Sequence, residues 1–141
     1  MHIMHKGECM EEAGITFVLE ALNVVKDHLG NFLIDTATSV DLVREVGSDN
    51  VKILYDAYHM YLNEGKVCEM IEKYGEFIGY LHVADAPGRG EPGTGAINFR
   101  TVMRCLSDIH YQNMVGFELY PSIDSAAAIK AIHECSESEG L

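Results

Sequence analysis

The sequence predicts an α/β fold in which helical crossovers connect the strands of a parallel sheet. Four apolar runs of strand length alternate with helix-like or loop-like segments, and this alternation is typical of parallel strands. The runs are hydrophobic throughout, as expected of strands covered on both faces. At 141 residues and 48% hydrophobic composition, the chain is predicted to form one domain spanning residues 1–141.

Each expected strand is an apolar run bounded by turn-forming residues. The four strands are expected at Ile15–Leu22, Val51–Asp56, Tyr80–Ala84 and Val115–Leu119. Two long loops follow the first and third of them. The first loop covers residues 23–35, and the second is the stretch APGRGEPGTGA at 86–96, where glycine and proline prevent regular structure. Loops of this length inside a compact domain are usually functional.

The helices are expected from hydrophobic spacing and from capping residues. Residues up to Gly14 resemble the tail of a helix, and Ser39 is expected to cap a short helix that ends at Gly47. The remaining helices are expected over residues 64–77 with Gly79 closing the segment, after the cap Asn98, and over Asp124–His133 before a polar tail that should fray.

Charge and apolar content limit the possible partners. The formal net charge of −12 and the pI near 4.8 argue against nucleic acids and anionic membranes, which would repel the chain. No apolar segment approaches the roughly 20 residues that cross a bilayer, and the first residues lack a signal peptide's apolar stretch. We therefore expect a cytoplasmic protein. Its scattered cysteines are expected to be reduced thiols.

Four polar residues stand near the ends of the four expected strands. They are Glu20, Asp56, His82 and Glu118, separated by 36, 26 and 36 residues. Carboxyl ends of parallel strands meet at one edge of a sheet, where α/β folds place their sites. Any one of these residues alone is better explained as a polar strand end that faces water. Converging carboxylates repel, however, and a bound cation removes that conflict.

Three carboxylates and one imidazole suit Mg²⁺ or Mn²⁺, with Co²⁺ or Zn²⁺ as further possibilities. His59 lies three residues after Asp56 and could reach a substrate oxygen, although a solvated loop histidine is an equal alternative. Arg89 in the glycine-rich loop could bind an anionic or hydroxyl-rich substrate, although a surface arginine is the simpler interpretation. The residues expected to be structural or exposed are His28, His110 and His133, together with the packing tyrosines 55, 58, 61 and 80.

The motifs LEALN, YDAYHM, HVADAPGRGEPGTGAINF and GFELYP resemble those of the hydroxypyruvate isomerase-like branch of the xylose isomerase-like TIM-barrel superfamily, which also contains ketose 3-epimerases. The resemblance runs from about Ile15 to Pro121. It implies that Glu20, Asp56, His82 and Glu118 bind a divalent metal and that His59 and Arg89 contact a small sugar or keto acid. It also implies an enediolate mechanism in which Glu20 and Glu118 move the proton.

Two departures from the family pattern affect what the resemblance implies. Ala96 stands where the family's GTGEIN motif has glutamate, which is expected either to weaken loop closure or to mark drift from the family pattern. The chain also matches only strands five to eight of an eight-stranded barrel, so we expect a (βα)4 half of a TIM barrel. Such a half leaves two open edges and is expected to pair with itself, to pair with a separate N-terminal half, or to be a piece of a longer gene product.

Three functions are consistent with these observations. The first is a metal-dependent isomerase or epimerase of small hydroxy-carbonyl compounds. The second is an inactive half-barrel that retains metal binding, and the third is a receiver-like doubly wound domain with an acidic site. An endonuclease of the same superfamily is disfavoured, because the acidic charge opposes DNA.

Overall fold

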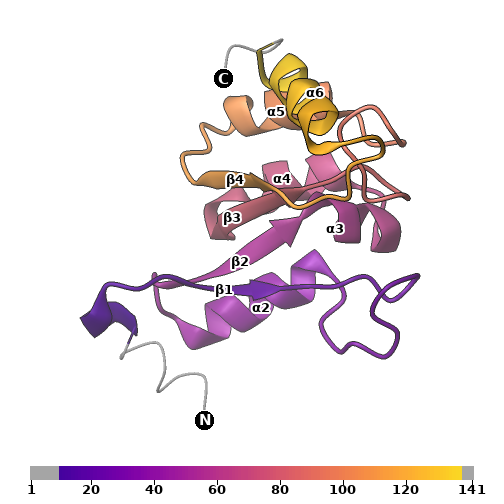
Figure 1. Cartoon of the computed structure of the whole chain (residues 1–141). Helices are drawn as coiled ribbons and strands as arrows, with labels where there is room; N and C mark the ends of the chain where they lie inside the picture. The colour runs from indigo at the N-terminus through magenta and orange to yellow at the C-terminus, as the bar shows by residue number, and fades with distance from the viewer. Residues whose placement is uncertain (1–9, 138–141) are drawn as a thin grey trace.

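The computed structural model describes residues 10–137 and contains a sheet of four parallel strands. The strands are β1 (Phe17–Glu20), β2 (Val51–Asp56), β3 (Ile78–Val83) and β4 (Met114–Phe117). They follow one another across the sheet in the order of the sequence, from β1, the lowest strand in Figure 1, to β4, the highest. This order confirms the predicted α/β fold. It contradicts the receiver-like alternative, because a doubly wound sheet reverses its strand order.

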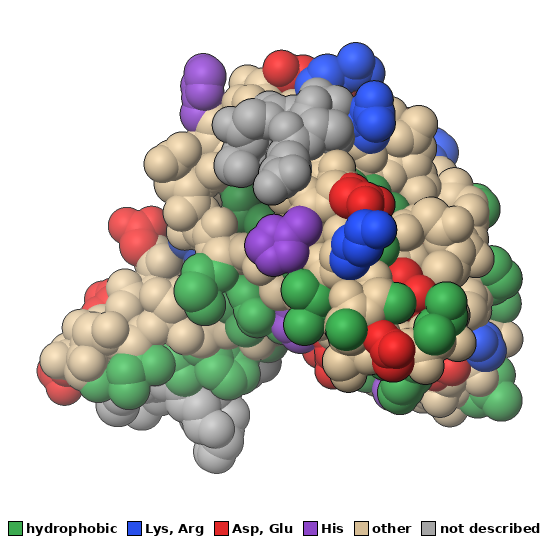
Figure 2. All heavy atoms as spheres, turned by 45° about the horizontal axis from the view of Figure 1, so that its top comes forward, with side chains coloured by type: hydrophobic (Ala, Val, Ile, Leu, Met, Phe, Trp, Pro, Cys, Tyr) green, Lys and Arg blue, Asp and Glu red, His purple; other side chains and the backbone are tan. Residues whose placement is uncertain are grey.

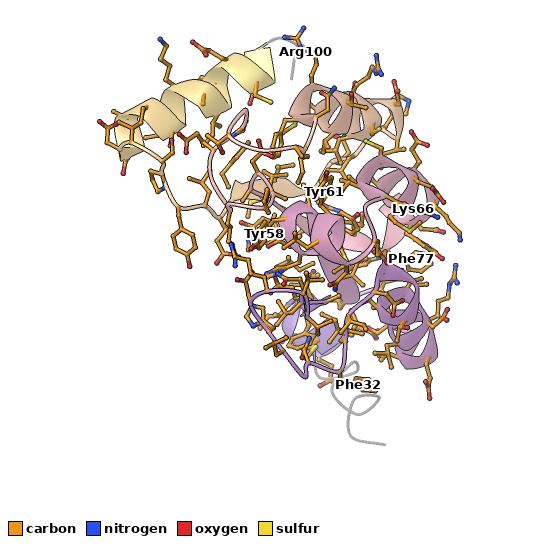
Figure 3. All side chains as sticks on the ribbon, turned by 90° about the vertical axis from the view of Figure 1, so that its right-hand side faces the viewer. Phe32, Tyr58, Tyr61, Lys66, Phe77 and Arg100 are labelled. Atoms are coloured by element: carbon orange, nitrogen blue, oxygen red, sulfur yellow. The ribbon has the colours of Figure 1, made fainter. Side chains whose placement is uncertain are left out.

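Helices connect the strands and follow the last one. They are α2 (Thr36–Val46), α3 (Ala57–Asn63), α4 (Val67–Tyr74) with the 3-10 turn η1 (Gly75–Phe77), α5 (Phe99–Asp108) and α6 (Ser125–Glu137). Residues 10–13 form a helical turn before Gly14, and earlier residues lie outside the described part of the chain. Helices α2, α4 and α5 lie along one side of the strands (Figure 3), as consecutive right-handed crossovers require.

Helix α2 begins earlier than the sequence predicts. The Asp35 side chain caps it by accepting a hydrogen bond from the Thr38 N–H at 2.7 Å. The predicted cap, Ser39, is buried within the helix, where its hydroxyl donates to the Asp35 carbonyl at 2.8 Å. Aspartate and serine are both good capping residues. The helix starts directly after Asp35 because its carboxylate accepts from a backbone N–H of the first turn, whereas the Ser39 hydroxyl donates to a carbonyl. The predicted end at Gly47 is confirmed, with φ at +69°.

The sequence does not predict helix α3, which the structure shows at Ala57–Asn63. It starts directly after β2, because one Asp56 carboxylate oxygen accepts from the Tyr58 N–H at 2.8 Å and caps the helix. Gly65, with φ at +69°, separates α3 from α4, so the helix expected from residue 64 begins instead at Val67. Gly79 does not close that segment but lies in β3, where a side chain would approach the Lys52 Cβ to 2.7 Å.

The other boundaries differ by a few residues from the prediction. Strand β1 is shorter at both ends, and β3 starts two residues earlier than expected. Strand β4 ends at Phe117, which leaves Glu118 just beyond it. Asn98 caps α5 as predicted, and α6 extends past His133 to Glu137. The end of the tail expected to fray lies outside the described residues.

The core lies between the sheet and the helices. Side chains alternate along β2 and β3, so that Ile53, Tyr55, Leu81 and Val83 are buried against the helices. The opposite face is less covered, and Leu54 on it is only half-buried. The prediction of strands buried on both faces therefore holds for one face.

Several large hydrophobic side chains are exposed at the sheet edges, in loops and on α6. Among the described residues they are Ile15, Phe17, Val25, Leu29, Phe32, Met114, Tyr120, Ile123 and Ile129. Hydrophobic side chains are visible in green over the lower half of the face shown in Figure 2. Phe17 belongs to β1 and Met114 to β4, the first and last strands of the sheet.

Two further expectations concern thiols and membrane segments. Cys68 and Cys105 are free thiols, as predicted, and Cys9 lies outside the described residues. Among residues 10–137, no helix has both the length and the apolar character needed to cross a bilayer.

Replacement of the α2 cap tests the observed helix start. Asp35→Ala should lower the free energy of unfolding by about 1 kcal/mol, because the Thr38 N–H loses its acceptor. Denaturant unfolding measures this loss. Asp41→Ala is the control, because this exposed residue of the same helix makes only an ion pair with Arg44. Equal effects of the two substitutions would contradict the assigned cap.

Candidate metal centre and loop-held arginine

The strand register brings the four predicted ligands to one face of the sheet. Asp56 lies directly opposite His82 in the β2–β3 pair. Glu20 is opposite Leu54, two residues before Asp56, and His82 is opposite Gly116, two residues before Glu118. Because side chains two residues apart share a face, all four point away from the helix-covered core. They lie at or just beyond the carboxyl ends of their strands.

Their polar atoms gather in two overlapping groups around Asp56. One ligand atom each from Asp56, His82 and Glu118 lies within 4.8 Å of the others. A second group with the same limit contains Glu20, Asp56 and His59. The four predicted ligands therefore share one region of the sheet, although no single group within the described residues contains them all.

Within residues 10–137, two buried atoms in this region lack hydrogen-bond partners. They are the second carboxylate oxygen of Asp56, Oδ2, and the imidazole Nδ1 of His82. Longer contacts approach them: His59 Nε2 is 3.6 Å from Asp56 Oδ2, and Glu118 Oε2 is 3.4 Å from His82 Nδ1. A buried lone pair without a donor is costly. The donor set of carboxylates and one imidazole fits a divalent cation, which would satisfy both atoms.

His59 is buried rather than solvated. Its side chain is 1% exposed, and it projects from α3, the helix that Asp56 caps. Its Nδ1 accepts a hydrogen bond from the Asn23 backbone N–H at 3.2 Å. Burial lowers the pKa of His59, while the nearby Asp56 carboxylate opposes that change. The alternative of a solvated loop histidine is wrong.

Arg89 lies between two of the acids. Its guanidinium donates to Glu118 Oε2 at 2.6 Å and lies 3.5 Å from Asp56 Oδ2. The guanidinium carbon also lies 5.0 Å from the centre of the Tyr58 ring, a cation–π distance. The Arg89 side chain is 14% exposed, so the simpler interpretation as a surface arginine is wrong.

The glycine-rich loop that carries Arg89 is organised by Asp85, which the sequence analysis does not single out. The buried Asp85 carboxylate accepts four backbone N–H bonds, at 2.8 to 3.0 Å, from Ala86, Gly93, Gly95 and Ile97. Gly95 is required there, because a Cβ atom would lie 2.1 Å from the Ala86 carbonyl oxygen. The sequence signal was an acid between a buried strand and a glycine-rich stretch.

The same loop is tied to the segment after β4. The Arg89 carbonyl accepts from the Tyr120 N–H at 2.8 Å, and the Glu91 carboxylate accepts from the Ser122 N–H at 2.9 Å and from its hydroxyl. Arg89 itself has a positive φ of +58°. Ala96 is exposed, and its N–H donates to the Ala86 carbonyl at 2.8 Å. This hydrogen bond between the two ends of the glycine-rich loop is made by backbone groups, so it forms without a side chain at position 96.

Glu20 carries a strongly shifted carboxyl group. Burial, followed by the negative charges of Asp56 and Glu118, raises its pKa from 4.5 to about 7. The Arg89 guanidinium acts in the opposite direction. Near neutral pH this residue can therefore accept or release a proton.

Consecutive parallel strands with outer helices and a polar site at the strand ends are the features of a β/α-barrel protein. The chain belongs to the family described as xylose isomerase-like TIM barrel, which matches residues 5–137. It is 32% identical over 129 residues to hydroxypyruvate isomerase of Escherichia coli (strain K12), covering 92% of this chain and 50% of that protein. It is 36% identical over 109 residues to D-psicose 3-epimerase of Ruminiclostridium cellulolyticum, covering 77% and 36%.

Solved structures give the same picture of the fold. The chain superimposes with a TM-score of 0.88 on an AP endonuclease, family 2, from Brucella melitensis, at 26% identity, covering 94% of this chain and 51% of the other. An L-ribulose 3-epimerase gives a TM-score of 0.80 at 26% identity, covering 97% and 52%. The chain thus spans about half the length, or less, of these relatives.

Loss of the Asp85 carboxylate should loosen the loop. Asp85→Asn turns one acceptor into a donor that faces backbone N–H groups, so we expect about 2–4 kcal/mol less unfolding free energy. Amide hydrogen exchange should also become faster at Gly93, Gly95 and Ile97. Asp49→Asn, at an exposed position, is the control. Unchanged protection of those three amides would contradict the role given to Asp85.

The Glu20 pKa predicts how stability changes with pH in metal-free protein. Because the folded state holds the Glu20 proton up to about pH 7 and the unfolded chain releases it near its ordinary value of 4.5, stability should fall as pH rises across this interval. Glu20→Gln should remove this part of the fall, and the exposed Glu12→Gln should not. Denaturation midpoints between about pH 5 and pH 8 measure the difference. A Glu20→Gln profile parallel to that of the unsubstituted protein would contradict the assignment.

Proposed function

We propose that this protein is a divalent-metal-dependent isomerase or epimerase of small hydroxy-carbonyl compounds such as hydroxypyruvate or ketose sugars. The observation that carries the proposal is that two buried atoms at the ends of neighbouring strands, Asp56 Oδ2 and His82 Nδ1, have no hydrogen-bond partner among the described residues. The names of the relatives, hydroxypyruvate isomerase and D-psicose 3-epimerase, support the class of reaction. The net charge of −12 also favours a small substrate over a nucleic acid.

The proposed metal ligands are Glu20, Asp56, His82 and Glu118. Their three carboxylates favour Mg²⁺ or Mn²⁺, and the imidazole also admits Co²⁺ or Zn²⁺. When bound, the cation polarises a substrate carbonyl and stabilises negative charge on the substrate oxygens. The two overlapping groups of possible ligands share Asp56, which supports a single site that these four residues would hold together.

Protons would be moved by the two glutamates. Glu20 removes or returns a proton at the substrate carbon, because its pKa of about 7 makes both protonation states accessible near neutral pH. Glu118 is the second proton-transfer group and lies just after β4, on the side of the site opposite to Glu20 on β1. Its ion pair with Arg89 holds its carboxylate in place. His59 and Arg89 are the proposed substrate-binding residues, because His59 is buried, the Arg89 side chain is only 14% exposed, and the polar groups of both lie near the acids.

We also propose that the four strands are half of a closed barrel. The relatives are about twice as long as this chain, and in the described residues β1 and β4 each pair on one side only. A further four-stranded half would cover the face that carries the site and supply the remaining walls of the substrate pocket. The second candidate function is a half-barrel that binds the metal without turnover, since the walls that such a second half would supply are not among the described residues.

Metal titration tests the centre. Mn²⁺ should bind to the unsubstituted protein, and Asp56→Asn should lower the Mn²⁺ affinity at least about tenfold. Losses of about tenfold are typical even for residues that only hydrogen-bond to a metal ligand, so loss of a ligand should cost no less. Asparagine still caps α3, so the fold is kept. Calorimetric titration measures the affinity, and His133→Gln on exposed α6 is the control. Unchanged Mn²⁺ affinity in Asp56→Asn would contradict both candidate functions.

Proton exchange separates the two candidates. With Mn²⁺ in D₂O, an isomerase should incorporate deuterium at the carbon next to the carbonyl of hydroxypyruvate or a ketose, detected by NMR. Glu20→Gln should abolish the exchange, because an amide cannot accept the proton. Mn²⁺ binding without any exchange would favour the half-barrel without turnover.

A further inference from the structure

The imidazole of His59 faces two hydrogen-bond donors of Asn23. The Asn23 backbone N–H lies 3.2 Å from His59 Nδ1, and the Asn23 side-chain nitrogen lies 2.6 Å from the same atom. A backbone N–H can only donate, so His59 Nδ1 must offer its lone pair. A neutral imidazole carries one proton, which is therefore on Nε2.

The orientation of the Asn23 amide is determined by its other contacts. Its oxygen accepts from the backbone N–H groups of Lys26 at 3.0 Å and Asp27 at 3.1 Å. Its nitrogen donates to Asp27 Oδ2 at 2.8 Å. Exchange of the amide oxygen and nitrogen would place an acceptor against the Asp27 carboxylate and a donor against two N–H groups. Asn23 is completely buried, so its side chain must keep these bonds.

The same network reaches the arginine of the opposite loop. The Tyr58 hydroxyl donates to Asp27 Oδ2 at 2.5 Å, and the Tyr58 ring lies under the Arg89 guanidinium. Figure 3 labels Tyr58 on α3 and Phe32 in the β1–α2 loop, the two segments that this contact joins. The Lys26 ammonium also donates to the Pro87 carbonyl at 3.0 Å. The loop after β1 therefore contacts His59 directly and is linked to Arg89 through Tyr58.

We propose that Asn23 is a positioning residue that fixes His59 as the Nε2–H tautomer, so that His59 donates a hydrogen bond to a substrate oxygen and does not bind the cation. With Nδ1 engaged by Asn23 and a proton on Nε2, the imidazole has no lone pair left for a metal. Of the two overlapping groups around Asp56, this leaves His82, whose Nδ1 has no donor, as the imidazole ligand. The substrate contact rests on the proposed function, whereas the tautomer does not.

Long-range ¹H–¹⁵N NMR of the imidazoles tests the tautomer in metal-free protein at a pH where the histidines are neutral. We expect His59 to show the Nε2–H pattern, with an unprotonated Nδ1. Asn23→Asp keeps the oxygen that accepts from Lys26 and Asp27 but puts a carboxylate oxygen against His59 Nδ1. It should move the proton to Nδ1 or make the ring doubly protonated. An Nδ1–H pattern in the unsubstituted protein, or an unchanged pattern in Asn23→Asp, would overturn the proposal.

The matched control is Asn31→Asp. Asn31 lies in the same loop and donates its side-chain N–H to the Leu33 carbonyl at 2.7 Å. This variant should leave the His59 tautomer unchanged, and a shift like that of Asn23→Asp would assign the effect to loop disturbance and overturn the proposal.

A diamagnetic metal supplies a second readout in the unsubstituted protein, which does not depend on any variant folding. Zn²⁺ should shift the ¹⁵N resonances of His82 and leave the Nε2–H of His59 in place. Loss of the His59 Nε2–H signal on Zn²⁺ addition would identify His59 as a ligand and overturn the proposal.

Kinetics distinguishes failure of the positioning role from failure of the proposed function. If the protein turns over a hydroxy-carbonyl substrate, Asn23→Asp should lower kcat/KM about tenfold, the effect of one hydrogen bond, while Mn²⁺ affinity stays within about twofold. Unchanged kcat/KM would overturn the substrate contact. No turnover by any variant, with the Nε2–H tautomer observed, would refute the proposed function and leave the assignment of the tautomer and the metal ligand intact.

Discussion

Electrostatic repulsion between acids at the strand ends is the constraint on which the rest of the site depends. Glu20, Asp56 and Glu118 share one face of a parallel sheet, where burial and, after it, the negative charges of Asp56 and Glu118 raise the pKa of Glu20. Two features of the site reduce the repulsion between these acids. Glu20 holds its proton to about pH 7, and the Arg89 guanidinium lies against the other two carboxylates. A divalent cation would neutralise the same charges more completely, and it would also satisfy the unpaired atoms at Asp56 and His82.

Two loops position the polar groups beside these acids, and each loop is organised by one buried polar residue. Asp85 gathers four backbone N–H groups and so shapes the loop that presents Arg89. Asn23 accepts two backbone N–H groups with its oxygen and directs its nitrogen at His59. Irregular backbone beside a site carries many unpaired N–H groups, and one short polar side chain can satisfy several of them at once. The positions of Arg89 and His59 therefore depend on Asp85 and Asn23, two residues that need not contact the substrate themselves.

The sheet explains both the likeness to barrel enzymes and the exposed surface. Its consecutive parallel order is that of a β/α barrel, and the family includes proteins about twice the length of this chain. In the described residues the helices cover one face of the sheet, whereas the face that carries the site is partly open. Phe17 and Met114 are exposed on the two outer strands. An apolar edge of this kind is normally covered by another strand, as barrel closure does.

The sequence by itself determined the parallel α/β fold and the residues of the acidic site, because apolar runs of strand length and polar residues at their ends are local patterns. It failed at α3, since the residue that starts this helix, Asp56, was interpreted only as a ligand, and capping depends on where the side chain points. Only the tertiary structure decided the roles of Asp85, Asn23 and Arg89. Their partners are backbone groups and charges that the fold brings together from distant segments, and no local pattern encodes which of these groups will meet.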